Sequence, residues 1–156
     1  MVAGVVLGDL PAALVQHLRA DVDVTALTGD RISLAFPEGR RAWPMPTYAI
    51  IIRPSGGPPP SLYDERRYSR VDVHFYGAGA SPNVRRRTAR LLWRTAEPAL
   101  NPPPNMGLAS GFQAAGMIVY SIAPQMSEPI MVPEPNTDWD RAIMSYLVHC
   151  SRLRTT

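Results

Sequence analysis

The hydrophobic and polar positions of the chain alternate most clearly over residues 68–76. The apolar side chains Val71, Val73 and Phe75 are interleaved with the polar ones Arg70, Asp72 and His74. Residues two apart lie on the same face of a β-strand, so this pattern predicts a strand with one buried face.

Three further segments have the same two-residue period and are predicted as strands: 47–53, 116–123 and 139–153. Residues 47–53 are apolar on both faces, which is typical of a central strand. In 116–123, one predicted face carries Ile118, Tyr120 and Ile122 and the other carries Met117 and Val119. In 139–153, the apolar face consists of Ala142, Met144, Tyr146, Val148 and Cys150.

Two segments carry helix-start signals. Asp9 before Leu10 and Pro11 predicts a helix that ends near Ala20. Ser81 before Pro82 predicts a second helix, which Pro98 and Pro102–Pro104 end. The buried stripe expected for the second helix is Val84, Thr88, Leu91, Leu92, Thr95 and Ala96. Its other positions hold Arg85, Arg86, Arg87, Arg90 and Arg94.

The connections between these elements contain many of the chain's 17 prolines. Gly29 suits a turn that requires a positive φ, and Arg31 after it is placed to hold that turn to the sheet. Residues 54–60 are rich in Pro and are not expected to continue the preceding strand, so a loop is predicted to about Arg67. Residues 124–138 form the second predicted long loop.

The element order is therefore α, β, β, α, β, β. It predicts an α+β fold with a mostly antiparallel four-stranded sheet, helices packed on one face, and two long Pro-rich loops. At 156 residues, the chain is expected to form a single domain over residues 1–156.

Composition restricts the classes of function. All 16 Lys or Arg positions of the chain hold Arg, and a preference in codon usage explains this more readily than selection for bidentate contacts. The net charge of +3 does not by itself indicate nucleic-acid binding. The single Cys150 is expected to be buried, and it excludes an internal disulfide or a multi-cysteine zinc site. The apolar N-terminus lacks a basic region, so no signal peptide or membrane segment is expected; the predicted location is a cytoplasm or a particle assembled there.

No set of catalytic residues stands out. The spacing typical of a metal site is absent among the three histidines, His17, His74 and His149. They are expected at the surface, although His74 and His149 could be neighbours on adjacent strands. No Gly-x-Ser-x-Gly motif occurs, and the Gly-Ala-Gly-Ala run at 77–80 lacks the fuller dinucleotide fingerprint. We therefore predict no enzymatic activity, catalytic residue, cofactor or metal.

Three groups of residues are predicted to contact protein partners. Arg86, Arg90 and Arg94 share one helix face, with Arg85 and Arg87 beside it. Solvation with nearby carboxylates, an acidic surface of a neighbouring subunit and DNA phosphate could each compensate this charge, in decreasing order of preference. The two loops contribute Leu62, Tyr63, Arg66 and Arg67, and Met126, Ile130, Met131 and Val132. These side chains could cap the domain's own core, but their composition favours contact with a neighbour.

In this order, the elements resemble the tail terminator, or tail completion, proteins of long-tailed bacteriophages and phage-like particles. The resemblance covers roughly residues 9–153. It rests on the first helix with Leu14 and Leu18, the run 24–32 (VTALTGDRI), the strands 46–52 (PTYAIII) and 71–76 (VDVHFY), the helix at 81–99 and the closing pair of strands.

The resemblance implies a structural virion protein that forms a six-fold ring at the head-proximal end of the tail tube, in the neck of the particle. Such a ring stops tube polymerisation and joins the tail to the head's connector or stopper protein, while DNA passes through its lumen. Its assembly in the host cytoplasm involves no membrane. Another neck component, such as a head-completion or stopper protein, is the nearest alternative; a DNA-binding accessory protein and a small hydrolase are more distant ones.

Overall fold

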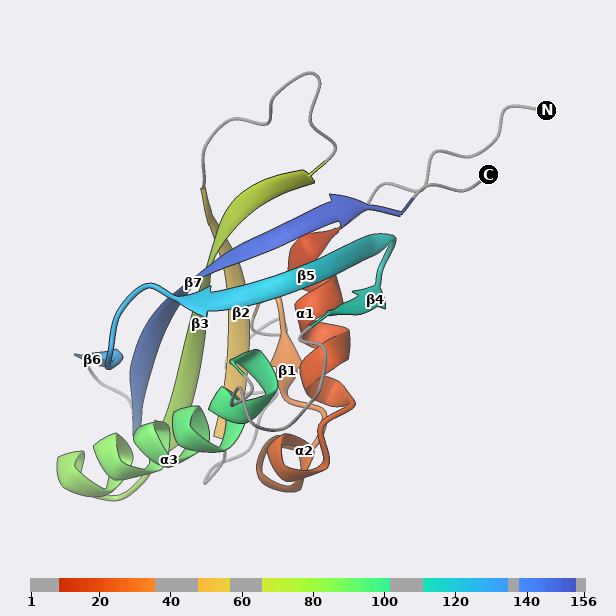
Figure 1. Cartoon of the computed structure of the whole chain (residues 1–156). Coiled ribbons are helices and arrows are strands. Elements are labelled where there is room, and N and C mark those ends of the chain that lie inside the picture. Colours follow the sequence, from red (N-terminus) through yellow and green to blue (C-terminus); the bar gives the residue numbers. More distant parts are fainter. Residues whose placement is uncertain (1–8, 36–47, 57–65, 102–110, 135–137, 154–156) are drawn as a thin grey trace.

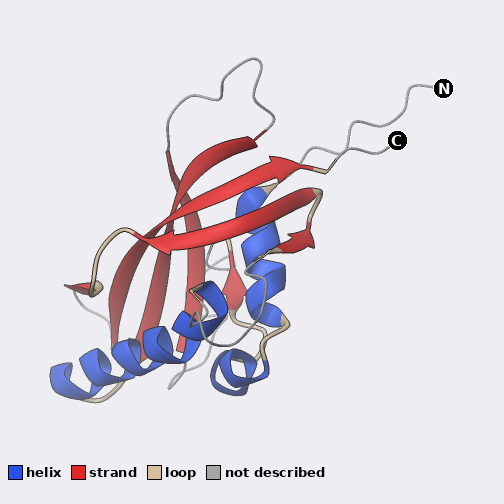
Figure 2. Ribbon diagram, in the orientation of Figure 1, coloured by secondary structure: helices blue, strands red, loops and turns tan. Residues whose placement is uncertain are grey.

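The computed structural model describes residues 9–35, 48–56, 66–101, 111–134 and 138–153. In this part of the chain, three helices lie against one face of a seven-stranded, mostly antiparallel sheet that curls around them (Figure 1). Coloured by secondary structure, the layers separate clearly into a helical side and a sheet (Figure 2). The α+β class and the placement of helices on one face are therefore as predicted, whereas the sheet is larger than the four strands expected.

The helices are α1 (Leu10–Arg19), α2 (Val22–Thr28) and α3 (Pro82–Leu100). The strands are β1 (Ile32–Ser33), β2 (Tyr48–Gly56), β3 (Arg66–Ala78), β4 (Phe112–Ala114), β5 (Met117–Pro124), β6 (Ile130–Pro133) and β7 (Trp139–Arg152). Their order across the sheet is β1-β2-β3-β7-β5-β4, and β6 also pairs with β7. Of these pairings, β1 with β2 is parallel and the others are antiparallel.

Strand β7 is the centre of the sheet. Along one edge it pairs with the whole of β3, from Trp139 opposite Ala78 to Ser151 opposite Arg66. Along the other edge it pairs first with β6, at Ile143 opposite Ile130, and then with β5. The loop predicted at 124–138 therefore returns to the sheet as a short strand.

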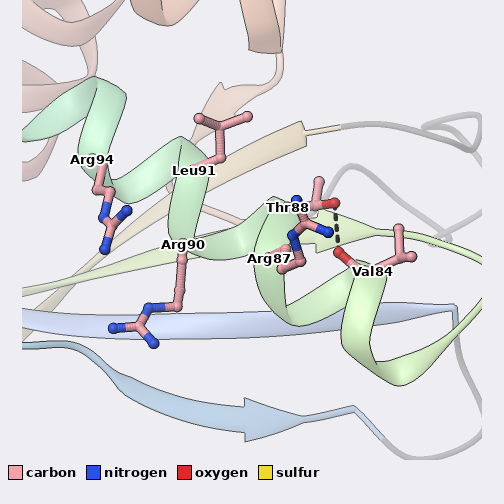
Figure 3. Close-up of a pocket in the computed structure, with 6 residues that line it drawn as sticks. All are labelled: Val84, Arg87, Thr88, Arg90, Leu91 and Arg94. Atoms are coloured by element: carbon pink, nitrogen blue, oxygen red, sulfur yellow. Dashed lines mark hydrogen bonds between the residues drawn. The ribbon is translucent and has the colours of Figure 1, made fainter.

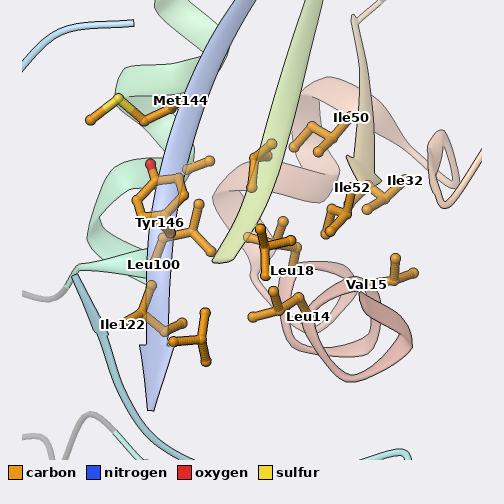
Figure 4. Packing of buried hydrophobic residues seen from close by; sticks show 14 of the residues in the cluster. Leu14, Val15, Leu18, Ile32, Ile50, Ile52, Leu100, Ile122, Met144 and Tyr146 are labelled. Carbon is orange, nitrogen blue, oxygen red and sulfur yellow. The ribbon is translucent and has the colours of Figure 1, made fainter. Parts of the chain in front are cut away.

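The core lies between the sheet and the helices (Figure 4). Asp9 caps α1 as predicted, accepting a hydrogen bond from the backbone nitrogen of Ala12 at 3.1 Å. The alternation predicted for β3 and β7 is confirmed, since the expected apolar faces are buried: Val71, Val73 and Phe75 on β3 and Ala142, Met144, Tyr146, Val148 and Cys150 on β7. Cys150 is a buried free thiol.

Helix α3 approaches the backbone of β3 at Gly77. A Cβ atom at Gly77 would overlap the backbone nitrogen of Ala89 and would lie 2.6 Å from the carbonyl carbon of Thr88. Ala89 itself is fully buried. The absence of a side chain at Gly77 therefore allows the helix to lie directly on the strand.

The turn after α2 also agrees with the prediction. Gly29 has a φ of 58°, and the Nε atom of Arg31 donates a hydrogen bond to the Tyr48 carbonyl at 3.0 Å. Arg31 thus connects the turn to β2. Helix α2 itself was not predicted, although Asp21 caps it by accepting from the Val24 nitrogen at 3.0 Å. Seven residues containing several β-branched side chains give little helical periodicity.

Strands β1, β4 and β6, at two, three and four residues, account for the difference between four strands and seven. Segments this short show too few alternations to be recognised from sequence. The prediction that residues 54–60 cannot continue the strand was also wrong at its start, because β2 runs through Pro54 to Gly56. Strand β1 pairs only with Ile50 and Ile51, so Pro54 lies where the outer edge of β2 has no β1 partner and a missing donor costs little.

In β5, the predicted faces were partly wrong. The register against β7 shifts between Val119 and Ser121, which marks a bulge. The bulge moves Ile122 onto the buried face with Met117 and Val119, away from Ile118.

The buried stripe of α3 also differs from the prediction. Its buried residues are Ala89, Leu92, Ala96 and Leu100. Val84 and Leu91, predicted as buried, are 47% and 49% exposed. At Ala89, the close approach to Gly77 leaves no room for a larger side chain. Pro98 does not end the helix, which continues to Leu100.

Gly77→Ala is expected to lower the free energy of unfolding by about 2–3 kcal/mol, because its methyl group forces α3 away from β3. Chemical denaturation of both proteins measures the difference. Ala80→Ser, which adds one atom at an exposed neighbouring position, serves as the control and should change stability little. Equal stability of Gly77→Ala and the wild type would show that the contact is not tight.

Candidate interaction surface

The outer face of α3 is the surface where the predicted arginines meet exposed apolar side chains. Ser81 caps the helix by accepting a hydrogen bond from the Val84 nitrogen at 3.3 Å, and Pro82 occupies its first turn. An open hollow of about 520 Å³ runs along this face, lined by Val84, Arg87, Thr88, Arg90, Leu91 and Arg94 (Figure 3). The face combines positive charge with apolar area, which suits a protein partner better than solvent alone.

The five arginines of α3 do not act as one group. Arg85 turns inward, where its Nε atom lies 3.4 Å from Oδ1 of Asp140, and both side chains are largely buried. Arg90 forms an exposed ion pair with Glu128 at 3.3 Å, which contributes little to stability. Within the described residues, no ion pair involves Arg86, Arg87 or Arg94. Carboxylates of the chain therefore compensate part of the charge, and the rest faces outward.

A partly buried polar cluster links α3 to the sheet. Oε2 of Glu97 accepts hydrogen bonds from the Tyr146 hydroxyl at 2.7 Å and from Nε1 of Trp93 at 3.0 Å. The pKa of the Tyr146 hydroxyl is raised above its usual value, mainly by burial and also by the neighbouring Glu97 carboxylate. The hydroxyl therefore remains protonated and acts as a donor. Glu97 therefore links α3 to Tyr146 on β7.

The predicted loop residues separate into distinct environments. Met126 and Met131 are partly buried and pack against the chain's own core, whereas Ile130 is 56% exposed and Val132 is half-buried. Arg66 and Arg67 belong to β3, where their backbones pair with Ser151 and Cys150. Leu62 and Tyr63 lie outside the described residues, as do the side chains of Arg66 and Arg67. The 124–138 segment meets α3 through the ion pair between Glu128 and Arg90.

The histidines are not gathered into a site. His74 lies opposite Ile143 and His149 lies opposite Tyr68, so the two are well separated along the β3–β7 ladder. His149 stacks on Tyr68 with ring centroids 4.7 Å apart. Nε2 of His17 bonds to the Ala99 carbonyl at 2.8 Å, and its ring stacks on Phe112. Each histidine therefore has contacts within the fold.

His74 differs from the surface position expected for it, because its side chain is only 7% exposed. Its Nδ1 lies 3.4 Å from the Arg141 guanidinium, which also forms an ion pair with Glu134 at 3.1 Å. Burial lowers the pKa of His74 to about 4, and the positive charges of Arg141 and Arg53 act in the same direction against a smaller opposing effect of Asp72. The imidazole is therefore neutral at pH 7.

A second exposed face, on α2, was not identified from the sequence. Val22 is 79% exposed, and Asp23 and Ala26 beside it are also exposed, as is Asp30 after the helix. The N-cap signal at Asp21 could have revealed the helix and hence this face. A helix with exposed Val and Asp presents apolar area and negative charge together.

Two classes of site find no support in the described residues. No group of three or more His, Cys, Asp or Glu side chains is arranged to hold a metal ion there. No helix in the same part of the chain combines the length and apolarity needed to cross a membrane.

Comparison with known proteins yields a structural likeness. Neither a protein-family model nor a curated protein sequence matches the chain. A chain in a solved structure described as "Virion of native gene transfer agent (GTA) particle" has the same fold, with a TM-score of 0.62 and 15% sequence identity. The similarity covers 96% of this chain and 99% of that chain. At this identity the likeness concerns the fold, which extends over nearly the whole of both chains.

Tyr146→Phe is expected to lower the free energy of unfolding by about 1–2 kcal/mol, because a partly buried oxygen of Glu97 loses one of its two described donors. Denaturant titration measures the change. Tyr68→Phe removes the same hydroxyl from a half-exposed tyrosine and should be nearly neutral. If the two variants were equally stable, Glu97 would not depend on the Tyr146 hydroxyl.

The buried His74 predicts a pH dependence of stability. The pKa of His74 is lower in the folded state than in the unfolded chain, so the unfolded state binds the proton first as the pH falls. The stabilisation is complete above about pH 6.5 and is lost progressively down to about pH 4, by about 2 kcal/mol in total.

His74→Gln, which cannot take up this proton, should show a flatter stability profile between those pH values. Urea unfolding at several pH values, compared between the variant and the wild type, isolates this contribution from the carboxylates common to both. Parallel profiles would mean that His74 does not titrate differently on folding.

Proposed function

We propose that this chain is a structural protein of a tailed, phage-like particle. In this proposal it forms a ring at the head-proximal end of the tail tube, ends tube polymerisation and joins the tail to the head connector. The observation that carries the proposal is the likeness to a chain of a gene transfer agent virion over 96% of this chain. The order of sequence elements that resembles tail terminator proteins supports it independently.

The use of polar residues in the described structure supports a structural role. Glu97 accepts from Tyr146 and Trp93, and Asp140 pairs with Arg85. These buried charged groups are engaged in holding α3 to the sheet. The outward-facing charge lies on helix faces that also carry apolar side chains, as expected for a protein that works by contact.

Ring formation requires two different contact surfaces on each copy, for which α3 and α2 offer candidates. Subunits of a closed ring make heterologous contacts, in which two different surfaces of each copy meet. The exposed faces of α3 and α2 are two such surfaces. In the proposed ring, its two ends contact the tail tube protein and the connector or stopper protein, and DNA passes through the lumen without a membrane being involved.

A second candidate is another neck component, such as a head-completion or stopper protein. The similar chain is described by the particle that contains it, and that description fits either position. The two candidates differ in their partner, which is a tail tube for a terminator and a portal-bearing capsid for a stopper.

The purified protein is expected to form closed rings, because the proposed contacts are between copies of the same chain. Light scattering gives the mass in solution, and negative-stain images of the same sample show whether a lumen is present. Co-sedimentation with purified tail tubes and with portal-bearing capsids then identifies the partner. Binding to tube ends supports the terminator role; binding only to capsids supports the stopper; binding to neither, with no rings, contradicts both.

A further inference from the structure

We propose that neighbouring copies in the ring join through the outer face of α3 on one copy and the outer face of α2 on the next. This inference rests on the proposed ring-forming function and names the contact that builds the ring. It concerns the outer faces of two different helices, and both belong to the described residues.

The α3 face consists of two parallel rows. Val84 and Leu91 are seven residues apart, so they lie along one line of the helix, and both are about half exposed. Arg87 and Arg94 have the same spacing and form the adjacent row, and both are exposed. Within the described residues neither arginine has an ion-pair partner. This face therefore presents an apolar row beside a positively charged row.

The α2 face has the opposite charge and a similar arrangement. Val22 and Ala26 are four residues apart on the helix and are exposed, with Val22 at 79%. Asp23 and Asp30 are also exposed, and Asp23 lies in the first turn of the helix. No ion pair involves either aspartate within the described residues. This face therefore presents an apolar pair beside negative charge.

The two faces complement each other in both charge and apolarity. Joining them covers the Val84–Leu91 row with Val22 and Ala26. It also brings Arg87 and Arg94 toward Asp23 and Asp30, none of which has an ion-pair partner among the described residues. Complementary potentials of this kind fix the register of a contact and suppress wrong pairings. The two faces belong to different helices, which contact each other within one copy.

The difference between the two surfaces decides the type of assembly. A contact between two different surfaces of the same chain is heterologous, and repetition of it generates a ring when the rotation closes. A symmetrical dimer through α3 alone would instead bring Arg87 and Arg94 of both copies together. The charges therefore favour a ring over a two-fold dimer.

A nucleic acid is the less suitable occupant of the α3 face. Phosphate would pair with the arginines but would leave Val84 and Leu91 without an apolar partner, and no aromatic side chain lines the hollow to stack on bases. A protein surface with acidic and apolar residues satisfies both rows, and α2 of a second copy provides one.

Charge reversal tests the contact in the full-length chain. Arg87→Glu with Arg94→Glu reverses the α3 face, and Asp23→Arg with Asp30→Arg reverses the α2 face. Each double variant is expected to weaken ring association by about 10- to 100-fold, measured by light scattering over a concentration series. The chain that carries all four changes is expected to recover association, because both faces are then reversed together. Raising the salt concentration should weaken the wild-type ring.

Arg86→Glu is the matched control, because Arg86 is exposed on the same helix but lies outside the two rows. It should assemble as the wild type does. Circular dichroism and thermal melting of every variant show that loss of association is not loss of folding. If wild-type rings form and the charge-reversed variants form them equally well, the α2–α3 contact is wrong while the proposed ring stands.

A disulfide test applies when wild-type rings form only on tube ends. A chain with Val22→Cys and Leu91→Cys, incubated with purified tail tubes under oxidising conditions, should give a ladder of cross-linked copies; the buried Cys150 provides the single-cysteine control. Tube binding without a ladder would overturn the contact alone. A chain that forms no rings and binds neither tubes nor capsids would overturn both the contact and the proposed function.

Discussion

Helix α3 lies directly on the backbone of β3, and the arrangement of the molecule depends on this close approach. Gly77 leaves space for the backbone at Thr88 and Ala89, so at this crossing the helix lies too close to the strand for a larger side chain. Protein interiors are packed too densely to absorb an extra group at such a point. The position of the helix, rather than the hydrophobicity of its residues, therefore decides which side chains become buried.

Two polar contacts then set the rotation of α3. Arg85 reaches Asp140 near the start of the helix, and Glu97 receives hydrogen bonds from Tyr146 and Trp93 near its end. Buried polar groups with partners specify one orientation, because any rotation would leave them unpaired. The same rotation turns Leu91 and the outer arginines away from the core. An exposed mixed surface is thus a consequence of how the helix is anchored.

The sequence predicted the long elements well because each carries several repeats of its period. The alternation in β3 and β7, the caps Asp9 and Ser81, and the role of Arg31 are all found in the structure. The short strands β1, β4 and β6 were not predictable, because they exist through pairing with longer strands and show no period of their own.

The outer face of α3 shows why a surface was harder to predict than an element. Helical spacing alone favoured burying Val84 and Leu91, since apolar residues usually mark the core side. The approach at Gly77 reverses that preference, and it joins residues far apart in sequence. Likewise, the bulge at Val119 in β5 depends on its register with β7, which sequence periodicity does not contain. The arginines were recognised as an outward-facing group, but the inward turn of Arg85 required knowledge of where Asp140 lies.

The central position of β7 has a consequence for how the chain folds during synthesis. Strand β7 joins β3 on one edge to β5 and β6 on the other, yet it leaves the ribosome after all three. Until then, β3 and β5 each present an open edge of unpaired backbone groups, which is a template for aggregation. Pairing residues 66–78 with residues 139–151 also closes long loops, which slows folding. A nascent chain that stops before β7 would therefore expose two unpaired strand edges. The sheet is complete only after its middle strand, the last to be synthesised, has been inserted.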